Sequence, residues 1–79
     1  MKKILIANRG EIAVRIARAC RDAGYASVAI ASEADRHALH AKSADECHIL
    51  KGTSPRETYL NQDAILAIAA HAGANAVHP

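Results

Sequence analysis

Short apolar runs alternate with helical repeats along the whole of this 79-residue chain. Strands separated by helices in this way form a parallel sheet, because each helix carries the chain back across a face of the sheet. No linker, low-complexity segment or internal repeat interrupts the alternation. The sequence therefore predicts one α/β domain over residues 1–79, with strands over residues 4–7, 27–31, 46–50 and 75–79.

Two helices have clear terminators. The first spans residues 10–23 and stops at Gly24, and the second follows Asn61 and stops at Gly73. Glycine adopts the left-handed backbone that ends a helix, and the side chain of Asn61 can cap the first turn. The residues expected to face the core are Ile12, Ala13, Ile16, Ala19, Cys20, Ala23, Ile65, Leu66, Ile68, Ala69 and Ala72.

Two other stretches give weaker helical signals. Residues 35–44 are compatible with a helix but contain a single large apolar residue, Leu39. Residues 54–57, with the sequence SPRE, carry a capping box in which Ser54 and Glu57 can each bond the backbone of the other. This pattern predicts a helix start at Pro55.

The connections restrict the order of the strands. Right-handed crossovers place the first three in the order 3-2-1, and return of the fourth to the free side of the first gives 3-2-1-4. The result is a Rossmann-like, three-layer fold with helices on both faces of the sheet. Because the switch point then lies between strands one and four, we expect Asn8, Arg9 and Gly10 to lie beside His78 and Pro79.

The first turn lacks the phosphate-binding pattern typical of such folds. A dinucleotide loop needs three glycines spaced G-x-G-x-x-G, but Gly10 stands alone between Arg9 and Glu11. Glu33 follows the second strand, where an acidic residue would hold a ribose, yet this feature alone is weak. The chain keeps the strand–turn–helix frame, and its sequence argues against NAD binding.

Composition argues against several other partners. A net charge of +2 is too small to indicate a nucleic-acid partner or an anionic membrane surface. The apolar start is interrupted by Asn8, Arg9 and Glu11, which argues against a signal peptide or a membrane span. Cys20 and Cys47 have no metal or redox spacing, so we expect buried, reduced thiols in a cytoplasmic protein.

The histidines form no recognisable metal motif. His37 and His40 are three residues apart, His48 and His71 are scattered, and no third ligand lies nearby. We expect these four side chains on the surface. His78 differs because it ends the fourth strand at the switch point, where it would orient the following loop or simply cap the sheet.

Three separated segments carry a family signature. They read KILIANRGEIAVRIARACRDAG (residues 3–24), SEADRHALHAKSADE (residues 32–46) and YLNQDAILAIAAHAGANAVHP (residues 59–79). In order and spacing they resemble the N-terminal, pre-ATP-grasp domain of biotin carboxylase. That component begins acetyl-CoA, propionyl-CoA and pyruvate carboxylases.

The resemblance implies an ATP-grasp ligase. Such an enzyme uses ATP with Mg²⁺ or Mn²⁺ to activate bicarbonate as carboxyphosphate, and then carboxylates biotin on a carrier domain that also serves a carboxyltransferase. The groups for this chemistry belong to the ATP-grasp and later segments. Residues 1–79 are therefore expected to be a scaffold that binds no cofactor and is inactive alone, and to depend on the ATP-grasp domain of the same protein.

The resemblance also implies roles for two groups of residues. In the family, the HP at residues 78–79 leads into a glycine-rich loop at the active site, so Asn8, Arg9, Gly10 and His78 are expected to face that site. On the first helix, Arg15, Arg18 and Asp22 share one face, with possible pairs Glu11–Arg15 and Arg18–Asp22. In bacterial members this helix contributes to a two-fold homodimer interface, so a solvated face and a dimer interface both stay open.

A second hypothesis comes from another functional class: a free-standing Rossmann-like module for nucleotide binding or protein interaction. The missing glycines argue against the nucleotide-binding version. The chain ends on a parallel strand, whose backbone and apolar surface need cover, and we therefore expect a fragment rather than a self-sufficient module.

Overall fold

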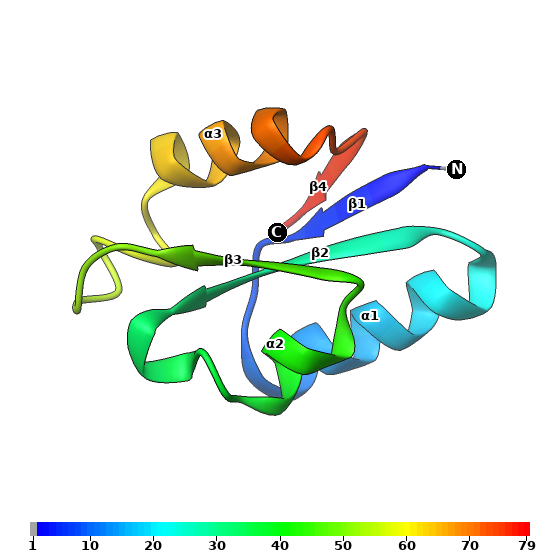
Figure 1. Cartoon of the computed structure of the whole chain (residues 1–79), viewed down its shortest axis with the longest axis horizontal. Coiled ribbons are helices and arrows are strands. Elements are labelled where there is room, and N and C mark those ends of the chain that lie inside the picture. The colour runs from blue at the N-terminus through cyan, green and yellow to red at the C-terminus, as the bar shows by residue number, and fades with distance from the viewer. Residues whose placement is uncertain (1) are drawn as a thin grey trace.

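The computed structural model describes residues 2–79 and shows a parallel sheet between two layers of helices (Figure 1). The four strands lie in the order β3-β2-β1-β4, which confirms the predicted α/β fold and its switch point. In chain order the elements are β1 (Lys3–Ile6), α1 (Gly10–Ala23), β2 (Ala26–Ser32), the 3₁₀ turn η1 (Glu33–Asp35), α2 (Leu39–Ser43), β3 (Glu46–Leu50), α3 (Gln62–Ala72) and β4 (Ala76–His78).

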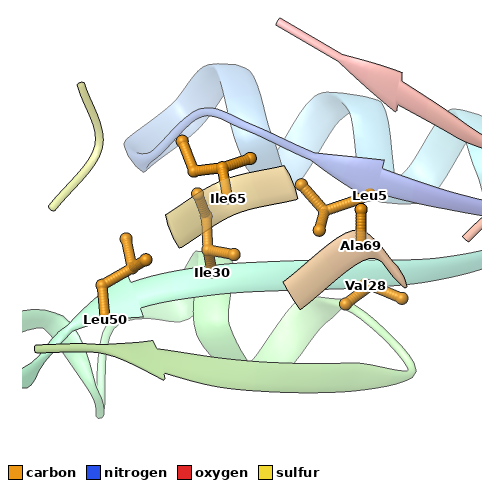
Figure 2. Close-up of a cluster of buried hydrophobic side chains, with 6 residues drawn as sticks. All are labelled: Leu5, Val28, Ile30, Leu50, Ile65 and Ala69. Carbon is orange, nitrogen blue, oxygen red and sulfur yellow. The ribbon is translucent and has the colours of Figure 1, made fainter. Parts of the chain in front are cut away.

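Strand β2 lies inside the sheet, and six of its seven residues are buried. Helix α3 covers one face of the sheet, where an aliphatic cluster joins three strands to the helix (Figures 1 and 2). Each large aliphatic side chain that is fully buried contributes about 1.5–3 kcal/mol relative to an exposed one. The cluster consists of Leu5, Val28, Ile30, Leu50, Ile65 and Ala69.

Helices α1 and α2 cover the opposite face (Figure 1). Ile6 of β1 packs there against Ala13 and Ala17 of α1, with Ile16 at the edge of the cluster. The alanines let α1 approach the sheet closely, because they leave little side-chain volume between helix and strand.

Both long helices end as predicted. Gly24 and Gly73 have φ values of 81° and 72°, and each stands directly after the last helical residue. The N–H of Tyr25 donates to the carbonyl of Cys20 at 2.8 Å, a bond typical of a left-handed helix end. At the start of α3, the Oδ1 of Asn61 accepts from the N–H of Ala64 at 3.1 Å, which confirms the predicted cap.

The capping box at residues 54–57 forms, but no regular helix follows it. Glu57 Oε1 accepts from the N–H of Ser54 at 3.1 Å, and Ser54 Oγ accepts from the N–H of Glu57 at 3.2 Å. The backbone N–H groups of Ser54 and Thr53 donate to the carboxylate and lower the pKa of Glu57. The chain then runs through turns to Asn61, where α3 begins anew, so the helix start predicted at Pro55 is wrong.

The helix predicted over residues 35–44 is also wrong in its extent. Within the segment only the five residues of α2 form an α-helix, η1 ends at Asp35, and Leu39 is 64% exposed. His40 and Ala41 are the buried residues of α2. With no large apolar side chain facing inward, the segment has too little core contact to stabilise more than one helical turn.

Some residues expected in the core lie on the surface. Leu66 and Ile12 are 60% and 55% exposed, whereas Ile65 is 6% exposed. The stripe of α3 that contacts the sheet is narrow, and Leu66 is turned about 100° from Ile65 around the helix axis. Ala19 and Ala23 are likewise exposed.

Among residues 2–79, no helix combines the length and the apolar character that a membrane crossing requires.

Two neighbouring residues of α3 test the direction of its inner face. We expect Ile65→Ala to lower the free energy of unfolding by about 2–5 kcal/mol, because it opens a cavity in the cluster beneath α3. Leu66→Ala removes an exposed side chain and serves as the matched control, with an expected change within about 0.5 kcal/mol. Urea unfolding followed by circular dichroism measures both, and equal losses would contradict the observed orientation.

Candidate functional site at the carboxyl edge of the sheet

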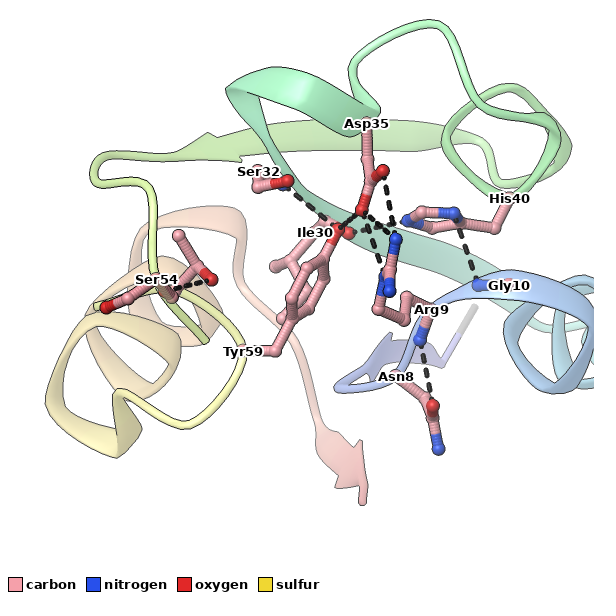
Figure 3. Close-up of polar contacts among 10 residues, drawn as sticks. Asn8, Arg9, Gly10, Ile30, Ser32, Asp35, His40, Ser54 and Tyr59 are labelled. Carbon is pink, nitrogen blue, oxygen red and sulfur yellow. Dashed lines mark hydrogen bonds and ion pairs between the residues drawn. The ribbon is translucent and has the colours of Figure 1, made fainter. Parts of the chain in front are cut away.

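Four residues from separate segments meet at the carboxyl ends of β1 and β2 (Figure 3). Arg9 comes from the β1–α1 turn, Ser32 ends β2, Asp35 ends η1, and Tyr59 lies between β3 and α3. We call these four residues the carboxyl-edge network. In open parallel sheets, ligands usually bind outside this edge, so the network occupies the region where a site would be sought first.

The guanidinium of Arg9 holds the carboxylate of Asp35 with two hydrogen bonds. Nε donates to Oδ2 at 3.0 Å, and Nη2 donates to Oδ1 at 3.1 Å. The guanidinium carbon also lies 5.4 Å from the centre of the Tyr59 ring. A planar, bidentate pair of this kind fixes direction as well as distance, so it sets the orientation of the β1–α1 turn relative to η1.

Tyr59 connects this ion pair to β2. Its hydroxyl donates to Asp35 Oδ2 at 2.7 Å and accepts from the backbone N–H of Ser32 at 3.0 Å. Across residues 2–79, every buried side-chain nitrogen or oxygen has a hydrogen-bond partner. The Tyr59 hydroxyl therefore links Asp35 to β2 through one donated and one accepted hydrogen bond.

The charges of the network are mutually stabilised. The hydrogen bond from Tyr59, followed by the contacts with Arg9, lowers the pKa of Asp35. Burial, together with the hydrogen bond to Asp35, raises the pKa of Tyr59. Because the pKa of Asp35 is lower in the folded chain than in the unfolded one, its contribution to stability is present at neutral pH and is lost as the pH falls through the folded value.

This arrangement joins the β1–α1 turn to η1 and to the segment that precedes α3. The Arg9 guanidinium and the Asp35 carboxylate neutralise each other, and the Tyr59 hydroxyl uses its proton on Asp35. A cavity of about 370 Å³ borders the network, lined in part by Thr53 and Thr58. Within residues 2–79, no group of three or more His, Cys, Asp or Glu side chains is placed to hold a metal ion.

The structure brings the tips of β1 and β4 together, as the predicted strand order requires. Ile6 pairs with His78, and the N–H of Ala7 donates to the His78 carbonyl at 2.8 Å. Asn8 Oδ1 accepts from the N–H of Arg9 at 2.8 Å. Gly10 has a φ of 66°, so a side chain there would strain the turn, and this explains the single glycine of the loop.

The residues predicted on the outer face of α1 are exposed but unpaired with each other. Arg15, Arg18 and Asp22 all lie on the surface. Of the two pairs predicted from helical spacing, Glu11–Arg15 and Arg18–Asp22, neither is among the ion pairs of residues 2–79. This face is therefore free of the intrahelical bridges that were expected.

Two predictions about single side chains are wrong. His40 was expected on the surface but is 2% exposed, beneath the start of α1. Its Nε2 lies 3.1 Å from the Ile30 carbonyl oxygen, and its Nδ1 lies 3.4 Å from the Gly10 nitrogen. Cys47 was expected to be buried but is exposed, because β3 is an edge strand with little cover on that side.

The sequence does not predict the contacts made by three residues at this edge: Asp35, His40 and Tyr59. Their contacts join positions 10 to 30 residues apart, so no local pattern marks them. The available signals were modest: Asp35 closely follows a buried strand, and Tyr59 is one of two aromatic residues, the other being Tyr25.

Comparison with known proteins gives the family. A family model described as the N-terminal domain of biotin carboxylase matches residues 1–79. The chain belongs to this family. Biotin carboxylase 1 of Bacillus subtilis is 51% identical over 79 residues, covering 100% of this chain. The 2-oxoglutarate carboxylase small subunit of Hydrogenobacter thermophilus is 49% identical over 78 residues, covering 99% of this chain.

Solved structures of biotin carboxylase domains have the same fold. One is the biotin carboxylase domain of a single-chain bacterial carboxylase, with a TM-score of 0.94 and 43% identity over 100% of this chain. Another is that of a thermophilic 2-oxoglutarate carboxylase bound to ADP, with a TM-score of 0.91 and 49% identity over 99% of this chain. The matches cover 16–18% of the relatives, so the chain spans less than a fifth of each.

The two tyrosines of the chain provide a matched test of the network. We expect Tyr59→Phe to lower the free energy of unfolding by about 1–3 kcal/mol, because it leaves the N–H of Ser32 without its acceptor. Tyr25→Phe changes a 40%-exposed ring and should alter stability by less than about 0.5 kcal/mol. Chemical denaturation measures both, and a Tyr59→Phe variant as stable as the wild type would contradict the role of the hydroxyl.

Proposed function

We propose that this chain is the N-terminal scaffold domain of a biotin carboxylase, the ligase that uses ATP and bicarbonate to carboxylate biotin on a carrier. The observation that carries this proposal is the family match over residues 1–79, together with a carboxyl edge whose polar groups bond one another. A domain of this kind contributes a rigid platform, and the longer protein contributes the chemistry.

The residues of this chain do not fit ATP. A nucleotide in a Rossmann-like fold uses free backbone N–H groups at the first turn, but here the Gly10 N–H faces His40 and the Arg9 guanidinium pairs with Asp35. No step of the reaction is therefore assigned to residues 1–79. ATP, Mg²⁺ or Mn²⁺, biotin and bicarbonate are ligands of the longer enzyme, and the ADP-bound relative supports nucleotide use by such domains.

The proposal includes partners and a location. The ATP-grasp domain of the same protein would pack on this scaffold, and the biotin carrier domain and the carboxyltransferase would receive the product in a cytoplasmic assembly. Asn8, Arg9, Gly10 and His78 would face the active site of that assembly. The support for this orientation is that the four residues lie at the tips of two neighbouring strands.

Two measurements test the scaffold role. In calorimetric titration, we expect neither ATP nor NAD to bind residues 1–79 with micromolar affinity. The full-length protein encoded by the gene should hydrolyse ATP in the presence of bicarbonate and Mg²⁺, at a rate that rises when biotin is added. Micromolar nucleotide binding by residues 1–79 would instead favour a free-standing nucleotide-binding module, and a gene that encodes no ATP-grasp segment would contradict the scaffold role.

We also propose that the outer face of α1 forms a homodimer interface through Arg15, Arg18 and Asp22. These side chains are exposed, and the missing intrahelical pair leaves Arg18 and Asp22 available to a second copy. A two-fold interface would place Arg18 of one copy opposite Asp22 of the other.

Charge reversal tests this interface in the full-length protein. Arg18→Asp and Asp22→Arg should each weaken the dimer by roughly tenfold or more, because each places like charges together. The double variant restores opposite charges and should recover most of the affinity. Lys51→Asp, at an exposed position after β3, serves as the control. Analytical ultracentrifugation measures the dissociation constant, and unchanged single variants would contradict the interface.

A further inference from the structure

The buried imidazole of His40 lies between Gly10, at the start of α1, and Ile30 of β2 (Figure 3). One ring nitrogen, Nε2, is 3.1 Å from the carbonyl oxygen of Ile30 in β2. The other, Nδ1, is 3.4 Å from the backbone nitrogen of Gly10. His40 therefore links the inner strand β2 to the start of α1.

These two contacts determine the state of the ring. The Ile30 carbonyl can only accept, so Nε2 must carry the proton. The Gly10 N–H can only donate, so Nδ1 must present its lone pair. The neutral ring with its proton on Nε2 satisfies both partners. The tautomer with its proton on Nδ1 satisfies neither, and the ring protonated on both nitrogens satisfies only the Ile30 carbonyl.

The start of α1 lacks an ordinary cap. Arg9 occupies the cap position, and its side chain makes no capping hydrogen bond to the helix. A helix start leaves several N–H groups without intrahelical partners, and a Ser, Thr, Asp or Asn side chain usually accepts from one of them. His40 supplies such an acceptor from a different helix.

The β1–α1 turn is thereby held at both ends. At one end, the N–H of Ala7 bonds to the carbonyl of His78 in β4. At the other end, Gly10 faces His40, and between them Arg9 pairs with Asp35. Without the contact at Gly10, the bonds from the turn and its flanking residue to other strands and loops would be those of Ala7 with His78 and of Arg9 with Asp35.

We propose that His40 is a positioning residue that fixes the turn of Asn8, Arg9 and Gly10 through a neutral, Nε2-protonated ring. Its effect on structure follows from the contacts above, and its effect on catalysis rests on the proposed function. If this turn borders the active site of the longer enzyme, a loose turn would slow the chemical step more than it would weaken ATP binding, which belongs to another domain.

Two amide variants of His40 separate its two contacts. The carboxamide of Asn reaches the region of Nδ1, so His40→Asn can still accept from the Gly10 N–H. The longer Gln side chain reaches the region of Nε2, so His40→Gln can still donate to the Ile30 carbonyl but leaves Gly10 without an acceptor. His37→Gln changes a neighbouring exposed histidine and serves as the control. All variants are made in the full-length protein encoded by the gene.

Hydrogen exchange, read by mass spectrometry on peptides covering residues 8–14, reports on the turn itself. We expect His40→Gln to accelerate exchange in the first turn of α1 about tenfold, the equivalent of one lost hydrogen bond. His40→Asn should stay within about threefold of the wild type because it retains the acceptor. His37→Gln should leave exchange unchanged.

Steady-state kinetics of biotin-dependent ATP cleavage report on catalysis. We expect His40→Gln to lower kcat about tenfold with little change in the KM for ATP, and His40→Asn to recover most of the loss. Wild-type exchange and kcat in His40→Gln, or equal losses in both variants, would overturn the proposal. If the wild-type protein shows no such activity, the proposed function fails, and hydrogen exchange alone then decides whether His40 fixes the turn.

Discussion

Strand β2 must be covered on both faces, because six of its seven residues are buried and it lies inside the sheet. The two faces receive different cover: α3 brings Ile65 and Ala69, while α1 brings alanines that allow close approach. A parallel sheet needs this two-sided cover, since its strands are apolar on both sides. Because all four strands are parallel, the loops that lead from strands to helices lie at the carboxyl edge of the sheet. The carboxyl-edge network and His40 lie at that edge.

At that edge, side chains from separate segments bond one another. Arg9, Asp35, Tyr59 and the N–H of Ser32 form one connected set, and His40 joins the first turn of α1 to β2. In related folds, the same region receives a nucleotide phosphate at a glycine-rich turn. Here the turn has one glycine, and its Arg9 side chain pairs with Asp35.

Much of the fold could be predicted because its signals are local. The bounds of α1 and β3 agree with those expected from the sequence, and Gly24 and Gly73 end their helices as predicted. The strand order also followed from the sequence, since right-handed crossovers leave few alternatives. The burial predicted for Leu66 from helical periodicity is wrong. Five apolar positions on α3 suggested a broad inner face, but the sheet contacts only a narrow stripe of the helix.

The sequence by itself determined the succession of strands and helices and where the long helices begin and end, because these depend on neighbours within a few residues. It also marked Asn8, Arg9, Gly10 and His78 as the tips of adjoining strands. Only the tertiary structure decided that His40 is buried, that Cys47 is exposed, and that Asp35 joins Arg9 to Tyr59. The contacts of His40 with Gly10 and of Asp35 with Arg9 and Tyr59 bridge 24 to 30 positions along the chain, and their geometry exists only after the sheet has assembled.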